Sequence, residues 1–205
     1  MTTYDREASG RRIRLTPQTS ALLVVDVQEK LAGAMPHEVM DQVTRNIAIL
    51  IDAAARFKIP IFVSEQYPKG LGKTVEAIHR ALAGAHDCTK IYRCEKLEFS
   101  AVATPGFVEL DIPRRGARPV YDQWIVCGME THVCIYQTVR DISGWGSTVH
   151  VVSDAVCSRT KANYRVGLDL TRDAGSVITS TEVAVFDLLG KAGSEDFKAL
   201  SKAIK

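Results

Sequence analysis

The stretch that decides the fold is ALLVVDV, residues 21–27, in which five apolar residues lead to the carboxylate of Asp26. A short, continuous apolar run rich in β-branched residues is typical of a strand that is buried on both faces. Such strands occur in parallel sheets that helices cover on each side. The stretch also singles out Asp26, because a carboxylate at the end of a buried strand is costly unless it is paired or hydrogen-bonded.

Further short apolar runs alternate with helical patterns along the rest of the chain. They predict extended segments at residues 59–64, 90–93, 121–127, 148–152 and 175–178. Helical patterns fall at residues 46–57, 73–83, 131–142, 160–174, 182–189 and 194–204. Strands that alternate with helices imply a mostly parallel sheet with helices on both faces. We therefore expect one α/β domain over residues 1–205, with an N-terminal arm at 1–15.

The composition is that of a folded protein without a strongly charged partner. The chain has 205 residues, of which 46% are hydrophobic and 24% are charged, and its net charge is +2. We therefore expect neither nucleic acid nor a membrane surface as a partner. Five cysteines at irregular spacings argue for a reducing compartment rather than a disulfide framework. Because the N-terminus is polar and no apolar run approaches about 20 residues, we expect a cytoplasmic protein.

Three polar residues near predicted strand ends are candidates for chemistry, because ligands of such sheets bind beyond the carboxyl ends of the strands. Asp26 is one, although a structural residue capping a loop has the same pattern. Lys96 by itself also resembles a solvated surface lysine. Cys134 falls in the first turn of a predicted helix, where N–H groups and the helix dipole favour a thiolate. The alternative for Cys134 is a packing thiol, which is the expected role of Cys127 and Cys157.

Together the three residues form a chemically usable set. A thiol nucleophile needs a proton acceptor, which Asp26 can supply. The Lys96 ammonium can stabilise both a thiolate and a carboxylate. Backbone amides at the start of the helix that carries Cys134 can hold a developing oxyanion.

The order of these motifs resembles the isochorismatase-like cysteine hydrolase superfamily, which includes nicotinamidases, N-carbamoylsarcosine amidase and isochorismatases. The matching segments are VVDVQ (24–28), KLEFSA (96–101), GMETHVC (128–134) and SDAVCSR (153–159). The likeness covers nearly the whole chain. Within the superfamily the chain looks most like the small isochorismatase domain-containing proteins, on the stretches at 65–72 and 179–182.

The resemblance implies a three-layer, Rossmann-like fold with a six-stranded parallel sheet, and an Asp–Lys–Cys triad at Asp26, Lys96 and Cys134. It also implies a cis peptide bond between Met129 and Glu130, which would aim the amides of Glu130 and Cys134 at one oxyanion. The implied activity is that of a cysteine hydrolase that cleaves a small-molecule amide or related C–N bond through a thioester acyl-enzyme. Relatives commonly form dimers or larger assemblies, so we expect a homo-oligomer, a dimer or a tetramer.

The departures from the relatives narrow the expected chemistry. Nicotinamidases carry an Asp-x-His metal site after the second strand, where this chain has SEQYP at residues 64–68, so we expect no metal and no other cofactor. Isochorismatases proper do not use a cysteine nucleophile, so Cys134 indicates acyl transfer. Gln66 and Tyr67 are candidate substrate-pocket residues, with loop packing as the alternative. His132 lies beside the cysteine, but helical residues two apart diverge, so we expect it in the pocket or at an interface.

The second hypothesis is a catalytically retired or moonlighting member that acts through protein interaction, with the triad left as scaffold. The two hypotheses make different predictions for Cys134. An enzyme would show selective alkylation of this thiol, whereas a scaffold would show equal, slow labelling of all five cysteines. An exposed apolar residue such as Trp145 could serve an interface between subunits.

Overall fold

A six-stranded parallel sheet runs through the centre of the computed structural model, which describes residues 13–205. The strands lie in the order β3-β2-β1-β6-β7-β8. Their bounds are β1 Ser20–Val25, β2 Ile61–Gln66, β3 Ile91–Lys96, β6 Gln123–Met129, β7 Thr148–Cys157 and β8 Val177–Thr179. The six-stranded sheet confirms the predicted α/β fold. Its order reverses between β1 and β6, which is the arrangement of Rossmann-like proteins.

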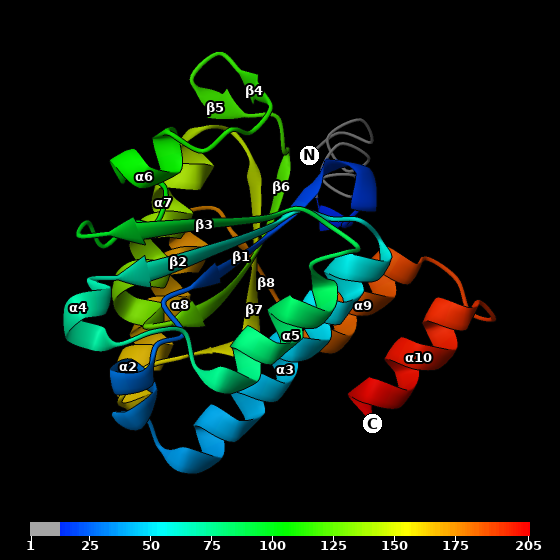
Figure 1. Ribbon diagram of the computed structural model, residues 1–205, viewed down its shortest axis with the longest axis horizontal. Helices are drawn as coiled ribbons and strands as arrows, with labels where there is room; N and C mark the ends of the chain where they lie inside the picture. Colours follow the sequence, from blue (N-terminus) through cyan, green and yellow to red (C-terminus); the bar gives the residue numbers. More distant parts are fainter. Residues whose placement is uncertain (1–12) are drawn as a thin grey trace.

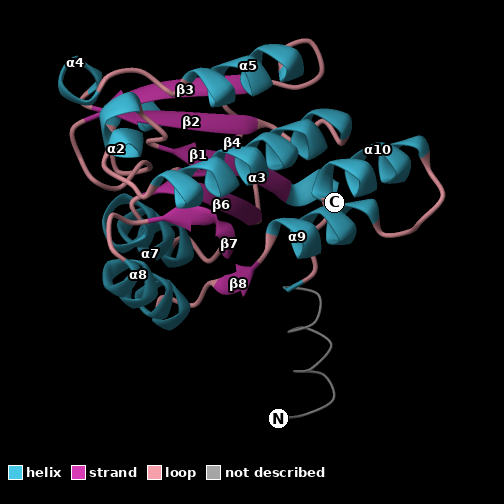
Figure 2. Ribbon diagram, turned by 90° about the horizontal axis from the view of Figure 1, so that it is seen from below, coloured by secondary structure: helices cyan, strands magenta, loops and turns pink. Residues whose placement is uncertain are grey.

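Helices cover both faces of the sheet and make the three predicted layers (Figures 1 and 2). One layer contains α3 (His37–Arg56), α5 (Glu76–Ala85) and α9 (Thr181–Leu189), with α10 (Glu195–Ile204) packed outside them. The other layer contains α7 (Tyr136–Gly144) and α8 (Lys161–Asp173). The connections hold the short helices α2 (Glu29–Gly33), α4 (Pro68–Leu71) and α6 (Pro105–Val108), the turn Pro17–Thr19, and the hairpin of β4 (Arg114–Arg115) and β5 (Arg118–Pro119).

Burial on both faces explains why the sequence of strand β1 shows no alternation of apolar and polar residues. All six of its residues are buried. Leu22 and Val24 belong to the hydrophobic cluster under α3 and α5, whereas Leu23 and Val25 belong to the cluster under α7. Because successive side chains of a strand point to opposite faces, a strand covered on both faces carries apolar residues on both of them, here at residues 21–25.

Strand β7 is longer than the sequence predicts, because it continues through the polar residues Ser153 and Asp154 as far as Cys157. Ser153 Oγ donates to the carbonyl of Thr179, at 2.8 Å. Asp154 Oδ1 accepts from the N–H of Thr181, also at 2.8 Å. These partners satisfy the polar side chains on the strand, so the polar pair did not end the strand as the sequence suggested.

Two expectations at the surface change in the structure. Trp145 is partly buried, and its ring lies against Phe107 and Trp124 with centroids 6.2 and 6.3 Å away. The expectation of an exposed interface residue there is therefore wrong. Of the predicted N-terminal arm, residues 1–12 lie outside the described part of the chain. Leu15 is buried in the core and its N–H donates to Asp187 Oδ2, at 3.2 Å.

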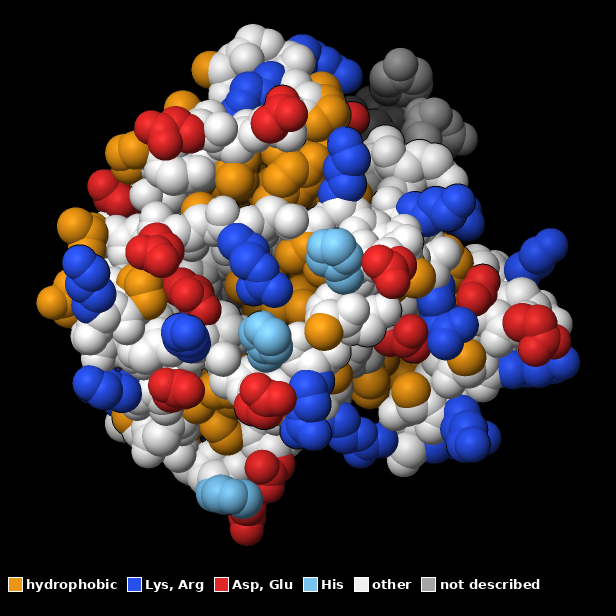
Figure 3. Space-filling model, in the orientation of Figure 1, with side chains coloured by type: hydrophobic (Ala, Val, Ile, Leu, Met, Phe, Trp, Pro, Cys, Tyr) orange, Lys and Arg blue, Asp and Glu red, His pale blue; other side chains and the backbone are white. Residues whose placement is uncertain are grey.

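The described surface shows no strong electrostatic bias on the face in Figure 3, where basic and acidic side chains are interspersed. None of the helices within residues 13–205 is long and apolar enough to cross a membrane.

Candidate active site

Three strand ends bring Asp26, Lys96 and Cys134 together at one edge of the sheet. Asp26 follows β1, Lys96 ends β3, and Cys134 lies in the π-helical turn Thr131–Ile135 after β6. Lys96 Nζ lies 2.7 Å from Asp26 Oδ2 and 3.6 Å from Cys134 Sγ. The side chains of Lys96 and Asp26 are both 0% exposed. Lys96 is therefore part of a buried charged cluster and not a solvated surface lysine.

The Asp26 carboxylate is oriented by strand β2. The backbone of Asp26 has a φ of 52°, in the left-handed region that Asp enters more readily than most residues. Its N–H donates to the carbonyl of Ser64, at 3.1 Å, and Ser64 Oγ donates to Asp26 Oδ1, at 2.7 Å. Oδ1 is thus held by the hydroxyl, which leaves Oδ2 facing the ammonium.

The Lys96 ammonium is surrounded by acceptors. Besides Asp26 and Cys134, it lies 2.7 Å from Gln66 Oε1, 3.1 Å from the carbonyl of Phe99 and 3.2 Å from the carbonyl of Glu98. An ammonium has three N–H donors and no acceptor. With these partners the Lys96 ammonium can stabilise negative charge on a neighbouring group. Of Lys96 and Asp26, Asp26 is therefore better placed to accept a proton.

The Cys134 thiol is protonated in the resting site. Burial raises the pKa of Cys134 to about 12; the charge of Asp26 adds to the rise and the Lys96 ammonium opposes it. Loss of hydration thus opposes the thiolate that the start of a helix favours, and it outweighs the effect of the ammonium on the thiol pKa. A nucleophilic Cys134 would need a base at the moment of attack.

The turn between β6 and Cys134 depends on close backbone packing. Gly128 has a φ of +117°, and a Cβ at this position would overlap the carbonyl of Val25. Glycine therefore lets β6 approach the end of β1, beside Asp26. The peptide bond between Met129 and Glu130 is cis, at the position that the resemblance implies.

Helix α8 and the end of β7 support the same turn from outside. A Cβ on Gly167 would lie 2.6 Å from both the Thr131 carbonyl carbon and the His132 nitrogen, so only glycine fits between helix and turn. Glu130 Oε1 accepts from the backbone N–H and the Nε of Arg159, at 3.1 and 3.0 Å. The Glu130 side chain is thus held by Arg159, and its contribution to the site would come from its backbone.

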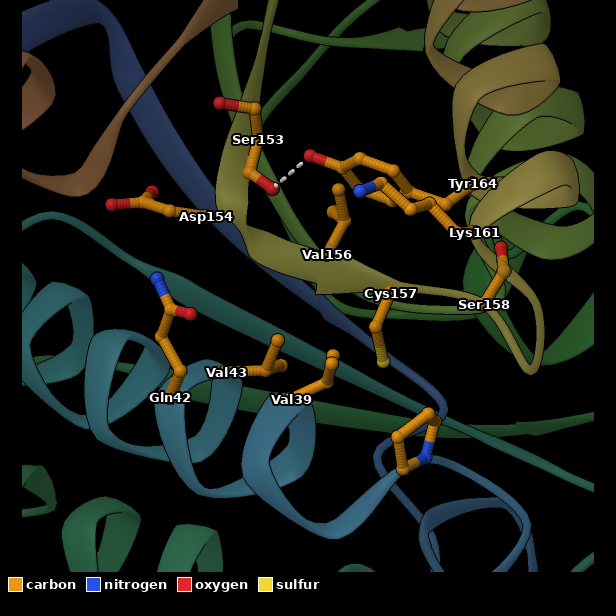
Figure 4. Close-up of a pocket in the computed structure, with 11 residues that line it drawn as sticks. Val39, Gln42, Val43, Ser153, Asp154, Val156, Cys157, Ser158, Lys161 and Tyr164 are labelled. Carbon is orange, nitrogen blue, oxygen red and sulfur yellow. Dashed lines mark hydrogen bonds between the residues drawn. The ribbon is translucent and has the colours of Figure 1, made fainter.

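His132 is directed toward the end of β7. Its Nδ1 lies 3.0 Å from Ser158 Oγ. Ser158 also lines a cavity of about 420 Å³ between α3, β7 and α8, shown in Figure 4, whose lining contains none of the three clustered residues. Several polar groups in the cavity wall already form hydrogen bonds within the protein. For example, the Tyr164 hydroxyl donates to the carbonyl of Ser153, at 2.8 Å.

A different cavity opens beside the charged cluster. It has a volume of about 460 Å³ and is lined by Tyr67, Pro68, Lys69, Glu95, Lys96, Leu97, Glu98, Thr104, Pro105 and Gly106. Tyr67, one of the three candidate pocket residues, is in this wall, whereas Gln66 and His132 are not. Gln66 instead contacts the ammonium of Lys96. Within residues 13–205, no group of three His, Cys, Asp or Glu side chains is arranged to hold a metal ion.

Sequence reasoning gave no role to Gln28, although the residue stands in the matching segment after β1. Its side chain is fully buried, and its amide bonds to backbone atoms. Nε2 donates to the carbonyls of Gln66 and Gly72, at 3.0 and 2.7 Å, and Oε1 accepts from the N–H of Gln66, at 2.7 Å. The available signal was an amide directly after a buried strand, since a buried amide must find partners.

Fold and cluster define a class of protein: a three-layer α/β protein in which parallel strand ends gather a thiol, a carboxylate and an ammonium. Residues 20–183 match the Isochorismatase domain family, and the chain belongs to this family. The sequence-based assignment to the isochorismatase-like hydrolases is thereby confirmed.

Relatives match over most of their length. The chain is 37% identical over 198 residues to the secreted isochorismatase effector Isc1 of Phytophthora sojae, covering 97% of this chain and 90% of that protein. It is 33% identical over 192 residues to isochorismatase domain-containing protein 2 of Bos taurus, covering 94% and 86%. Among solved structures, the MAR1 ribonuclease from Caenorhabditis elegans superposes with a TM-score of 0.79 at 35% identity, covering 93% and 92%.

Proposed function

We propose that the protein is a cysteine hydrolase that cleaves a small amide or related C–N bond through a thioester acyl-enzyme. The observation that carries the proposal is the position of the buried Lys96 ammonium, 2.7 Å from Asp26 Oδ2 and 3.6 Å from Cys134 Sγ. A base, a nucleophile and a fixed positive charge thereby share one site, which is the arrangement that covalent catalysis by a thiol requires.

The chemical sequence follows from the protonation of the resting site. Asp26 takes the Cys134 proton as Sγ forms a bond to the substrate carbonyl carbon, and the carbonyl electron pair moves to oxygen. The backbone N–H groups of Glu130 and Cys134 hold this oxyanion. When the C–N bond breaks, Asp26 gives its proton to the leaving nitrogen. Asp26 then deprotonates a water that attacks the thioester; the acid leaves, and the proton returns to Sγ.

Lys96 makes the first step possible without joining in proton transfer. The pKa of the Cys134 thiol is raised by burial to about 12, so the thiolate exists only as the bond forms. The ammonium stabilises the negative charge as it moves from the carboxylate to sulfur and on to the carbonyl oxygen. A small substrate would enter from the 460 Å³ cavity that Tyr67 and Leu97 line.

A panel of small primary amides, including nicotinamide, tests the reaction class by ammonia release. We expect release with the wild-type protein and none with Cys134→Ala, and a mass increase of Cys134 equal to the acyl group in quenched samples. Because the Caenorhabditis elegans relative is named a ribonuclease, an RNA oligonucleotide belongs in the panel. RNA cleavage that survives Cys134→Ala, with no amide turned over, would replace the proposal by a different chemistry.

The alternative is a retired member that acts through protein interaction. The observation that favours it is the burial of Cys134, 6% exposed, with a protonated thiol. Mild iodoacetamide labelling of all five cysteines separates the two. Selective alkylation of Cys134 that is lost in Asp26→Asn and in Lys96→Ala supports the hydrolase. Equal, slow labelling of all five thiols supports the scaffold.

We further propose a homo-oligomer, a dimer or a tetramer, in a reducing compartment such as the cytoplasm. Apolar side chains near the cluster support association, since Leu97, Phe99 and Tyr67 are 72%, 53% and 51% exposed. All five cysteines are free thiols, which supports the compartment, although the Phytophthora relative is named a secreted effector. Light scattering gives the subunit number, and a thiol titration without reductant should find five free thiols.

A further inference from the structure

Gln66 makes a contact with the charged cluster that the proposed reaction does not use. Its Oε1 lies 2.7 Å from Lys96 Nζ, and its Nε2 donates to the carbonyl of Leu97, at 2.8 Å. The two contacts fix the orientation of the amide. Turning it over would place the NH₂ group against the ammonium and the oxygen against a carbonyl, and both new contacts would be repulsive.

Gln28 fixes the backbone that carries this amide. Its Nε2 and Oε1 bond to the carbonyl and the N–H of Gln66, and Nε2 also bonds to the carbonyl of Gly72. The Gln28 side chain is buried, so these bonds are shielded from competing water. The chain leaving β2 is thus tied to the chain leaving β1 at the residue whose side chain reaches Lys96.

We propose that Gln66 is a positioning residue that holds the Lys96 ammonium between Asp26 and Cys134, and that Gln28 is the residue that holds Gln66. The inference rests on the proposed function, because it explains how the charge that stabilises the thiolate is kept in place. Neither glutamine is proposed to touch substrate.

The side chain of Gln66 is neutral, and its neutrality matters for the charge at Cys134. Five acceptors lie around the three N–H donors of Lys96, and only Asp26 among them carries a full negative charge in the resting site. Gln66 therefore directs the ammonium without cancelling its field at sulfur. A carboxylate at position 66 would fit the same space, but it would compete for the ammonium and place a second negative charge near Cys134.

Two substitutions separate positioning by a neutral acceptor from simple structural support. Gln66→Glu keeps the shape and adds a charge, whereas Gln66→Met removes both hydrogen bonds and adds none. Gln18→Glu is the matched control, because Gln18 is exposed and precedes the amino end of β1, whereas the charged cluster lies at the carboxyl ends of the strands. The readout is the rate of Cys134 alkylation by iodoacetamide at pH 8, followed by peptide mass spectrometry, together with kcat and KM on any amide that the panel finds.

The expected order of alkylation rates is wild type, then Gln66→Met, then Gln66→Glu. A charge this close to sulfur should slow Gln66→Glu by about tenfold or more, equivalent to about one unit of thiol pKa. Gln18→Glu should match wild type, and kcat should fall in the position 66 variants with little change in KM. If Gln66→Met is as slow as Gln66→Glu or slower, or if both folded variants react like wild type, the positioning role is wrong.

Failure of the proposed function would look different. If wild type hydrolyses no amide but the alkylation order is as expected, the hydrolase proposal falls and the positioning role stands. If wild type hydrolyses amides and both position 66 variants keep its kcat and alkylation rate, the positioning role falls and the hydrolase stands. Gln66→Met has no added charge and keeps the test decisive if Gln66→Glu does not fold.

Discussion

Replacing Lys96 by Met should reveal how strongly the buried ion pair contributes to stability. Methionine keeps an unbranched stem of similar length but removes the ammonium. The Asp26 carboxylate, 0% exposed, would then be left in the core without the ammonium, although the Ser64 hydroxyl would still donate to its Oδ1. A buried charge without a compensating partner is among the most destabilising changes in a protein.

The magnitude follows from the distance between the two charged atoms. At the 2.7 Å that separates Lys96 Nζ from Asp26 Oδ2, with an effective dielectric constant of about 20, the attraction is about 6 kcal/mol. Loss of hydration by both ions offsets part of this attraction. Removal of one partner of a buried pair costs about 3–5 kcal/mol, and we expect Lys96→Met to lower the free energy of unfolding by that amount.

The assay is urea unfolding followed by circular dichroism at pH 7, for Lys96→Met, Asp26→Asn and the double variant. Because the double variant carries no buried charge at the pair, we expect it to be more stable than Lys96→Met alone, by about 1 kcal/mol or more. The two single effects should therefore not add. Additive losses, or a cost for Lys96→Met within about 0.5 kcal/mol of zero, would refute the view that the two charges depend on each other.

Three further predictions concern the surroundings of the site. Burial raises the pKa of Cys134 and Cys157 to about 12, and unfolded thiols ionise near about 8.5. The free energy of unfolding should thus be constant below about pH 8.5 and decrease above it, by up to about 1.4 kcal/mol per pH unit for each thiol. Cys157→Ala should reduce this slope in alkaline urea titrations, and an unchanged slope would contradict the raised thiol pKa of Cys157. Gly167→Ala should cost about 1–3 kcal/mol through its clash with the Thr131 turn, whereas Gly84→Ala, with open space around it in α5, should gain about 0.5–1 kcal/mol; equal melting temperatures would refute the contact. Gln28→Met leaves three backbone groups without their side-chain partner and should cost about 3 kcal/mol or more, measurable as a lower urea midpoint.

The central strands β1 and β6 could be predicted because they are buried on both faces. Every residue of β1 is buried, so an unbroken apolar run was required and was visible in the sequence. The end of β7 could not be predicted in this way. Ser153 and Asp154 are polar, and they remain in the strand because Thr179 and Thr181, from the next strand and helix, bond to them.

The candidate site was visible mainly through the order of its motifs. Asp26 and Lys96 lie far apart in the chain, and no local pattern pairs them; each by itself had an ordinary structural explanation. The protonation of Cys134 was beyond a sequence argument, because the helix start is local whereas the burial that raises the thiol pKa comes from the whole packed core. Gln28 was missed for a related reason, since its partners are backbone atoms that no side-chain pattern shows.

The central position of β1 has a consequence for synthesis of the chain. Leu22 pairs with Ile61 on one side of the strand and with Ile125 on the other. During translation β1 can join β2 early, but its second edge has no partner until β6 has left the ribosome. An uncovered apolar strand edge invites pairing with other chains. Nascent chains that stall after β3 should therefore aggregate or be held by chaperones. Such chains contain Asp26 and Lys96 but not yet Cys134.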